Sequence, residues 1–139
     1  METKIFVDTS ALIALFNSKD QCHSKATIYF EALDPNTVQF HTSNYIIDET
    51  ITRIRVQDGH HYALEFCKHF FTSKIFHVHY IEKDIEKAAL ELFKKYFDKE
   101  LSFTDCTSFA LMKQLKIKKA FTFDDDFIKV GFEIDNPID

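Results

Sequence analysis

The stretch KIFVDTSALIALF, residues 4–16, joins the sequence patterns of a strand and a helix. Its first part, residues 4–7, is short and apolar, which predicts a buried strand. The polar residues 8–10 then break the apolar run, and Asp, Thr and Ser are side chains that commonly begin helices. Residues 11–16 continue as an apolar helix. A polar turn therefore follows a buried strand, at the place where ligands gather in parallel α/β sheets.

The rest of the chain repeats this alternation of strand and helix. Helical patterns cover 22–33, 43–57, the stretch after Gly59 up to residue 72, 81–97 and 102–115, and strand patterns cover 38–41, 74–80 and 119–123. A short helix at 124–130, stopped by Gly131, and an edge strand at 132–134 complete the pattern. Strands separated by helices predict an α/β fold with three layers, in which a mostly parallel, twisted sheet has helices on both faces. The length fits a single domain spanning 1–139.

Composition excludes several kinds of protein. The chain has only two glycines, far apart, so it contains neither a GxGxxG nor a Walker A loop. Cys22, Cys67 and Cys106 are widely separated, and an odd count argues against a disulfide framework. We therefore expect reduced cysteines and a cytoplasmic location. The longest apolar run, residues 11–16, is too short to span a membrane.

Charge gives an ambiguous signal about nucleic acid. The formal net charge of −5 argues against a binder that relies on a basic surface. Bound divalent cations reverse the sign of the local field, so the same charge is compatible with a nuclease. The densest basic group is Lys113, Lys116, Lys118 and Lys119, which is either a solvated helix end or a contact for backbone phosphates.

Four acidic residues from distant parts of the chain are placed to meet at one end of the predicted sheet. Asp8 follows the first strand directly, and Asp124 directly follows the strand at 119–123. Glu49 lies in the helix after the second strand, and Asp105 lies in the first turn of the helix before the last major strand. Because ligand sites lie beyond the carboxyl ends of parallel strands, we expect these carboxylates to converge there.

Converging carboxylates repel one another unless a cation lies between them. Two unit charges about 4 Å apart repel by about 4 kcal/mol at an effective dielectric near 20. Hard carboxylate oxygens suit Mg²⁺ or Mn²⁺. Such ions activate water and stabilise the attacking and leaving oxygens of a phosphodiester. The acids therefore indicate a metal site but leave the reaction type open.

Each acid also has a purely structural interpretation. Asp8 could cap the helix that follows it. Glu49 could pair with Arg53, four residues later, on an exposed face. Asp105 fits the N3 position of a capping box. The run at 124–126 could be the solvated acidic start of a helix, favoured by the helix dipole.

Four segments together resemble the PIN-domain family. They are FVDTSALIAL from Phe6, DET at 48–50, LSFTDCTSFALMKQLKI from Leu101 and AFTFDDDF from Ala120. They occur in the family's order, at about its spacing, over nearly the whole chain. The closest resemblance is to the VapC-type toxins of prokaryotic toxin–antitoxin pairs.

The resemblance implies an endoribonuclease that depends on Mg²⁺ or Mn²⁺. The family's four acids match Asp8, Glu49, Asp105 and Asp124, which we expect to be both catalytic and metal-binding. Asp126 could assist or substitute as a metal ligand, because the local run is more acidic than the family's pattern requires.

The resemblance also extends to neighbouring groups and to partners. It suggests hydroxyl support from Ser10 and Thr122, and Asp48 is the neighbour to test if Glu49 is not the ligand. It implies an RNA substrate, a small protein antitoxin that wraps the chain, and a homodimer of the toxin itself.

Two further patterns have simpler explanations. His77 and His79 share one face of a strand, but neither an HExxH nor a Cys–His spacing supplies further zinc ligands. The phenylalanines Phe66, Phe70 and Phe71 are expected in the core or at a subunit interface rather than as stacking platforms for bases.

Two other functions remain open at this stage. A phosphatase of the haloacid-dehalogenase type also begins with a strand-end Asp, but it needs a second Asp two positions later, where this chain has Ser10. A non-catalytic metal- or RNA-binding module of the same PIN-like fold would use the acids only to hold a cation. It predicts metal-dependent stabilisation without strand breakage.

Overall fold

Five strands form one sheet, in which every neighbouring pair is parallel. The computed structural model describes residues 2–135. The strand order is β3-β2-β1-β4-β5. In chain order the strands are β1 Thr3–Val7, β2 Val38–Ser43, β3 Phe76–His79, β4 Lys119–Phe121 and β5 Glu133–Ile134. The predicted sheet is confirmed, and it is parallel throughout its described pairs.

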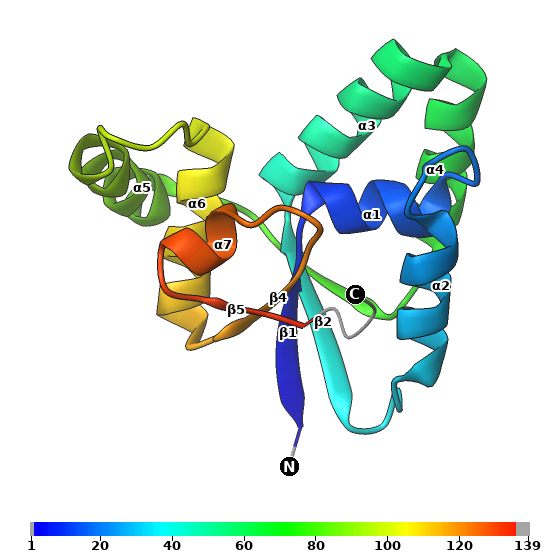
Figure 1. Cartoon of the computed structure of the whole chain (residues 1–139), viewed down its shortest axis with the longest axis horizontal. Helices are drawn as coiled ribbons and strands as arrows, with labels where there is room; N and C mark the ends of the chain where they lie inside the picture. Colours follow the sequence, from blue (N-terminus) through cyan, green and yellow to red (C-terminus); the bar gives the residue numbers. More distant parts are fainter. Residues whose placement is uncertain (1, 136–139) are drawn as a thin grey trace.

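Helices cover both faces of this sheet, with α1, α2 and α4 on one side and α5, α6 and α7 on the other (Figure 1). The helices are α1 Thr9–Phe16, α2 His23–Ala32, α3 Asn44–Asp58, α4 His60–Thr72, α5 Lys83–Lys95, α6 Phe103–Leu115 and α7 Asp126–Lys129. The predicted three-layer α/β architecture is therefore confirmed. None of the described helices is long and apolar enough to cross a membrane.

The strand order reverses at β1, in the middle of the sheet. The chain passes from β1 to β2 and β3 on one side, and later returns to β4 on the other side of β1. Ligands in open α/β sheets bind beyond the carboxyl ends of the strands at such a reversal. Asp8 lies at this point, directly after the last residue of β1.

β4 ends two residues earlier than its sequence pattern predicts. Beyond Phe121 the backbone N–H groups bond to side chains rather than to a neighbouring strand: Phe123 N donates to Ser10 Oγ at 2.9 Å, and Asp124 N donates to Thr122 Oγ1 at 3.0 Å. The prediction that Asp124 directly follows a strand is therefore wrong. It lies in a tight turn between β4 and α7, and α7 begins only at Asp126.

β3 and α5 are also shorter at both ends than predicted. Ile81, expected at the start of α5, instead donates its backbone N–H to Asn44 Oδ1 at 2.8 Å. This bond ties the segment before α5 to the start of α3, so the helix begins only at Lys83.

Each of the two helices that carry Glu49 and Asp105 begins with a side-chain cap. Ser43 begins α3, and its Oγ accepts a hydrogen bond from Ile46 N at 3.2 Å. Ser102 begins α6 in a complete capping box with Asp105, as the sequence predicts. α3 ends at Gly59, whose φ of 104° favours glycine and turns the chain directly into α4.

Phenylalanine packing anchors α4 against α1 and the edge of the sheet. The ring of Phe16 meets that of Phe66 edge-on at 5.4 Å, and Phe70 lies 5.1 Å from Phe76. Phe66 and Phe70 are buried, which confirms the expected core role, whereas Phe71 is exposed. α4, which packs against α3, is thus held to α1 and to the sheet edge by an aromatic cluster.

Candidate active site

Asp8 is the buried centre of the candidate site. Its side chain is 4% exposed, and its Oδ2 accepts a hydrogen bond from Thr122 Oγ1 at 2.9 Å. Asp8 occupies the N-cap position of α1, yet its side chain makes no capping bond. The interpretation of Asp8 as a simple helix cap is therefore wrong, because its carboxylate turns toward the β4–α7 turn instead.

The hydroxyls of Ser10 and Thr122 join α1 to that turn. Their oxygens lie 3.1 Å apart, and Ser10 Oγ lies 3.5 Å from Asp8 Oδ2. The same two oxygens accept the backbone N–H groups of Phe123 and Asp124. One small network therefore orients the Asp8 carboxylate and shapes the turn that carries Asp124. Ser10 and Thr122 thus provide the hydroxyl support that the family resemblance suggested.

Glu49 reaches the site from α3. Its Oε1 accepts a hydrogen bond from the Thr9 hydroxyl, which is buried at the start of α1. The alternative ion pair with Arg53 does not form within residues 2–135. Thr9 was not singled out in the sequence, because nothing local links it to a residue forty positions later.

Asp105 serves two purposes at the start of α6. Ser102 Oγ accepts from Asp105 N at 3.0 Å, while Asp105 Oδ2 accepts from Ser102 N at 3.1 Å. The capping interpretation is thus confirmed. The other oxygen, Oδ1, accepts no hydrogen bond from the described residues, and the side chain lines the same cleft as Asp8.

The three aspartates at 124–126 form the tightest acidic group. One carboxylate oxygen from each lies within 4.8 Å of the others, the only such group of three metal-ligating side chains in the described part of the chain. Asp124 Oδ1 accepts from Asp126 N at 3.0 Å. Lys129 contacts Asp125 at 3.6 Å and Asp126 at 3.4 Å, so part of this charge is offset.

These groups line one open cleft of about 760 Å³ beyond the carboxyl ends of the strands. All five predicted acids border it, and the full lining is Asp8, Ser10, Glu49, Arg53, Glu100, Ser102, Asp105, Phe123, Asp124, Asp125 and Asp126. Asp8, Glu49 and Asp105 share the cleft but stand outside the tight group at 124–126. Arg53 and Glu100 are lining residues that the sequence did not reveal.

Burial and mutual repulsion raise the pKa values of these carboxyls. Burial raises the pKa of Asp8 to about 7, against the hydrogen bond from Thr122 and with smaller contributions from the charges of Asp105 and Glu49. Burial also raises the pKa of Asp105 to about 6, with Asp124 and Glu49 adding to it and the bonds from Ser102 opposing it. The pKa of Asp126 is raised by burial and by Asp124.

The donor set fits a hard divalent cation. Seven carboxyl groups border the cleft, and burial makes at least two of them, Asp8 and Asp105, hold their protons more tightly than usual. Oxygen-only ligands of this kind suit Mg²⁺, Mn²⁺ or Ca²⁺ rather than zinc. A bound cation would replace those protons and relieve the repulsion.

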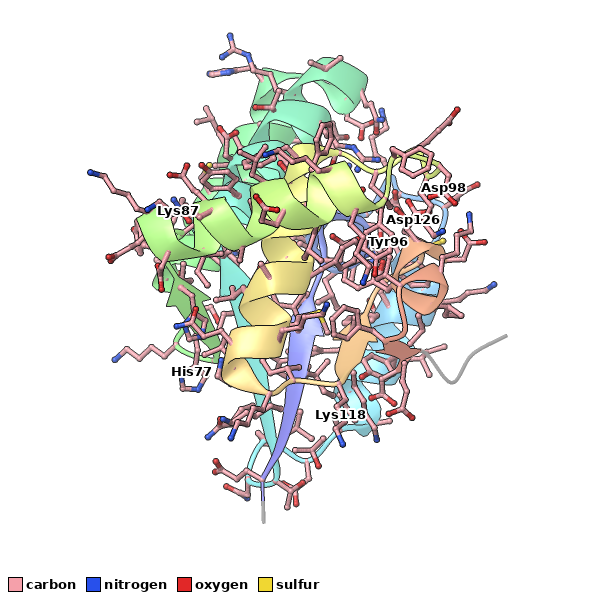
Figure 2. The ribbon with its side chains drawn as sticks, turned by 90° about the vertical axis from the view of Figure 1, so that its left-hand side faces the viewer. His77, Lys87, Tyr96, Asp98, Lys118 and Asp126 are labelled. Carbon is pink, nitrogen blue, oxygen red and sulfur yellow. The ribbon has the colours of Figure 1, made fainter. Side chains whose placement is uncertain are left out.

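Other sequence features lie away from this cleft. Figure 2 shows Asp126 at the same end of the molecule as Asp98, with Lys118 and His77 toward the other end. The lysines around Lys118 border a separate hollow at the amino-terminal ends of β1 and β4. His77 and His79 stack with His41, whose Nδ1 lies 2.8 Å from His79 Nε2.

Comparison with known proteins supports the resemblance to the PIN-domain family. The PIN domain family model matches residues 5–133. The 23S rRNA-specific endonuclease VapC20 of Mycobacterium tuberculosis is 35% identical over 128 residues, which cover 92% of this chain and 95% of that protein. A VapC ribonuclease of Archaeoglobus fulgidus is 28% identical over 114 residues, covering 81% of this chain and 72% of that protein.

Solved structures agree with the fold described above. The crystal structure of M. tuberculosis VapC20, described as a sarcin–ricin loop cleaving toxin, superposes with a TM-score of 0.87 at 34% identity, covering 96% of this chain and 99% of that one. VapBC2 from Rickettsia felis, bound to a DNA fragment from its promoter, gives a TM-score of 0.73 at 9% identity, covering 96% and 98%, and supports the fold alone. The chain therefore belongs to the PIN-domain family, among the VapC-type ribonucleases.

Proposed function

We propose that this chain is a divalent-metal-dependent endoribonuclease, the toxin of a toxin–antitoxin pair, which hydrolyses phosphodiester bonds in ribosomal RNA. The observation that carries the proposal is the meeting of carboxylates from β1, α3, α6 and the β4–α7 turn in one cleft. Three buried or half-buried hydroxyls, those of Thr9, Ser10 and Thr122, hold two of these carboxylates in place.

Asp8, Glu49, Asp105 and Asp124 are the residues we assign to metal binding and catalysis, with Asp126 as a further ligand. The metal is Mg²⁺ or Mn²⁺. When bound, such an ion activates water and neutralises charge on the oxygens of the phosphodiester. The chain itself supplies orientation: the Ser10–Thr122 network holds Asp8, Thr9 holds Glu49, and the capping box holds Asp105.

The substrate proposal rests on the M. tuberculosis relatives. One is named a 23S rRNA-specific endonuclease and its structure is described as a sarcin–ricin loop cleaving toxin. We therefore place 23S rRNA, and its sarcin–ricin loop in particular, first among the substrates to test. An RNA substrate also agrees with the cytoplasmic location expected from three free cysteines.

The proposed partners are a protein antitoxin and a second copy of the toxin. Large apolar side chains are exposed on the α3–α4 hairpin, at Val56, Leu64 and Phe71, and near the α5–α6 connection, at Phe93 and Phe97. Large apolar side chains left exposed on one element are candidates for contact with a partner protein. Two separate sets on this chain agree with two kinds of protein partner.

Cleavage of 23S rRNA by the purified chain tests the proposal. Ribosomal RNA is incubated with Mg²⁺ or Mn²⁺, with EDTA, with the Asp105→Asn variant, and with the Asp48→Asn variant as a matched control. Asp48 is exposed beside Glu49 and does not line the cleft. We expect discrete fragments that require metal, disappear with Asp105→Asn and persist with Asp48→Asn. Intact RNA together with metal-dependent thermal stabilisation would instead indicate a non-catalytic binding module.

A further inference from the structure

Among the described residues, Arg53 is the only cationic side chain that lines the acidic cleft. It lies on α3, four residues after Glu49, so both side chains project from one face of the helix about one turn apart. Arg53 is exposed, and within residues 2–135 it forms no ion pair with any of the seven carboxyl groups around it. Its guanidinium therefore remains available to an anionic ligand.

We propose that Arg53 binds a phosphate of the RNA strand that enters the cleft, and this rests on the ribonuclease function proposed above. A guanidinium is always charged and presents paired N–H donors that match two oxygens of one phosphate. The surrounding carboxylates repel a phosphate wherever no cation intervenes. A positive group at the rim therefore complements the metal in binding the RNA backbone.

Among the described residues, the other cations beside the acidic turn at 124–126 are Lys99 and Lys129, and each has an acidic partner, which for Lys99 is Asp98 at 3.6 Å. Lys129 lies near the cleft but is engaged by Asp125 and Asp126. The lysines Lys116, Lys118 and Lys119 border a different hollow, at the opposite ends of the strands. In a chain with a net charge of −5, attraction of RNA by a general basic surface is weak. A single arginine at the cleft therefore contributes a large share of the electrostatic attraction.

Arg55 provides a matched control on the same helix. It lies two residues beyond Arg53, and successive residues of a helix are rotated by about 100°, so it projects from the other side of α3. Arg55 is also exposed and does not line the cleft. Changing either arginine removes the same charge from the same helix, and only the position relative to the cleft differs.

The test is the affinity of the full chain for a fluorescein-labelled sarcin–ricin loop hairpin, measured by anisotropy in Mg²⁺. The Asp105→Asn background prevents cleavage during the titration. We expect Arg53→Gln to weaken binding by about 10- to 100-fold, the usual effect of losing hydrogen bonds to a charged group. Arg53→Lys should recover part of the loss because it keeps the charge but not the paired donors. Arg55→Gln should change affinity by less than about threefold.

Mn²⁺ affinity, measured by calorimetry without RNA, separates phosphate binding from support of the metal site. Arg53→Gln should leave Mn²⁺ affinity unchanged or tighter, because removing a positive charge favours a cation. Equal weakening of Mn²⁺ and RNA binding would overturn the proposal. So would RNA binding by Arg53→Gln equal to that of Arg55→Gln, while the wild-type chain still cleaves rRNA. If the wild-type chain neither cleaves nor binds RNA, the proposed function itself fails.

Discussion

Replacing Asp8 with Asn should remove a large pH dependence from the stability of the metal-free chain. The folded-state pKa of Asp8 is about 7, above the ordinary value of 3.8, because the carboxyl is buried. The folded state therefore holds this proton more tightly than the unfolded state does. The stability gained in this way is fully present below pH 3.8 and is lost as the pH rises to 7.

The size of the effect follows from this pKa. Each pH unit between the two pKa values changes the free energy of unfolding by about 1.4 kcal/mol, so the loss between pH 5 and pH 7 is about 2 to 3 kcal/mol. Asp105, with a pKa of about 6, adds a loss of the same sign. His41, whose pKa is lowered to about 4, acts in the opposite direction. Both groups are present in wild type and in Asp8→Asn, so their own titrations largely cancel, and the difference reports Asp8 together with its charge coupling to Asp105.

The assay is urea unfolding in EDTA at pH 5 and at pH 7, for wild type and for Asp8→Asn. We expect the variant to gain about 2 to 3 kcal/mol relative to wild type between the two pH values. Adding Mg²⁺ should stabilise wild type at pH 7 far more than at pH 5, since the metal competes with the proton. If the difference in unfolding free energy between wild type and variant is the same at pH 5 and at pH 7, Asp8 is ionised at both pH values, and the reasoning is refuted.

Three other substitutions separate site orientation from stability. Thr9→Val removes the hydroxyl that holds Glu49, and metal affinity in calorimetry should fall by about 10- to 100-fold with little change in Tm. Ser43→Ala removes the cap of α3 and should lower the free energy of unfolding in urea by about 1 kcal/mol. Phe66→Ala opens a cavity among buried rings and should cost about 3 to 5 kcal/mol in the same assay.

Much of the site was visible in the sequence because its signals are local. A short apolar strand followed by Asp8 predicts a carboxylate at the end of the sheet, and the structure places it there. The Ser102–Asp105 spacing predicts a capping box, which the structure confirms. The two interpretations of Asp105 were not exclusive, because one carboxylate oxygen caps the helix and the residue still lines the cleft.

The parts that could not be predicted depend on contacts between distant segments. The bond from Thr9 to Glu49 spans forty positions, so no local pattern reveals it. β4 ends early because Ser10, at the start of α1, accepts the backbone N–H of Phe123 beyond the strand. The sequence suggested an ion pair between Arg53 and Glu49. The structure shows instead that Glu49 accepts a hydrogen bond from the Thr9 hydroxyl.

Anomalous diffraction from crystals of the chain grown with Mn²⁺ tests the central claim most directly. The account predicts a manganese peak inside the cleft, with oxygens of Asp8, Asp105 and Asp124 among its ligands. Manganese found only on exposed acids outside the cleft, or no peak at millimolar Mn²⁺, would contradict it.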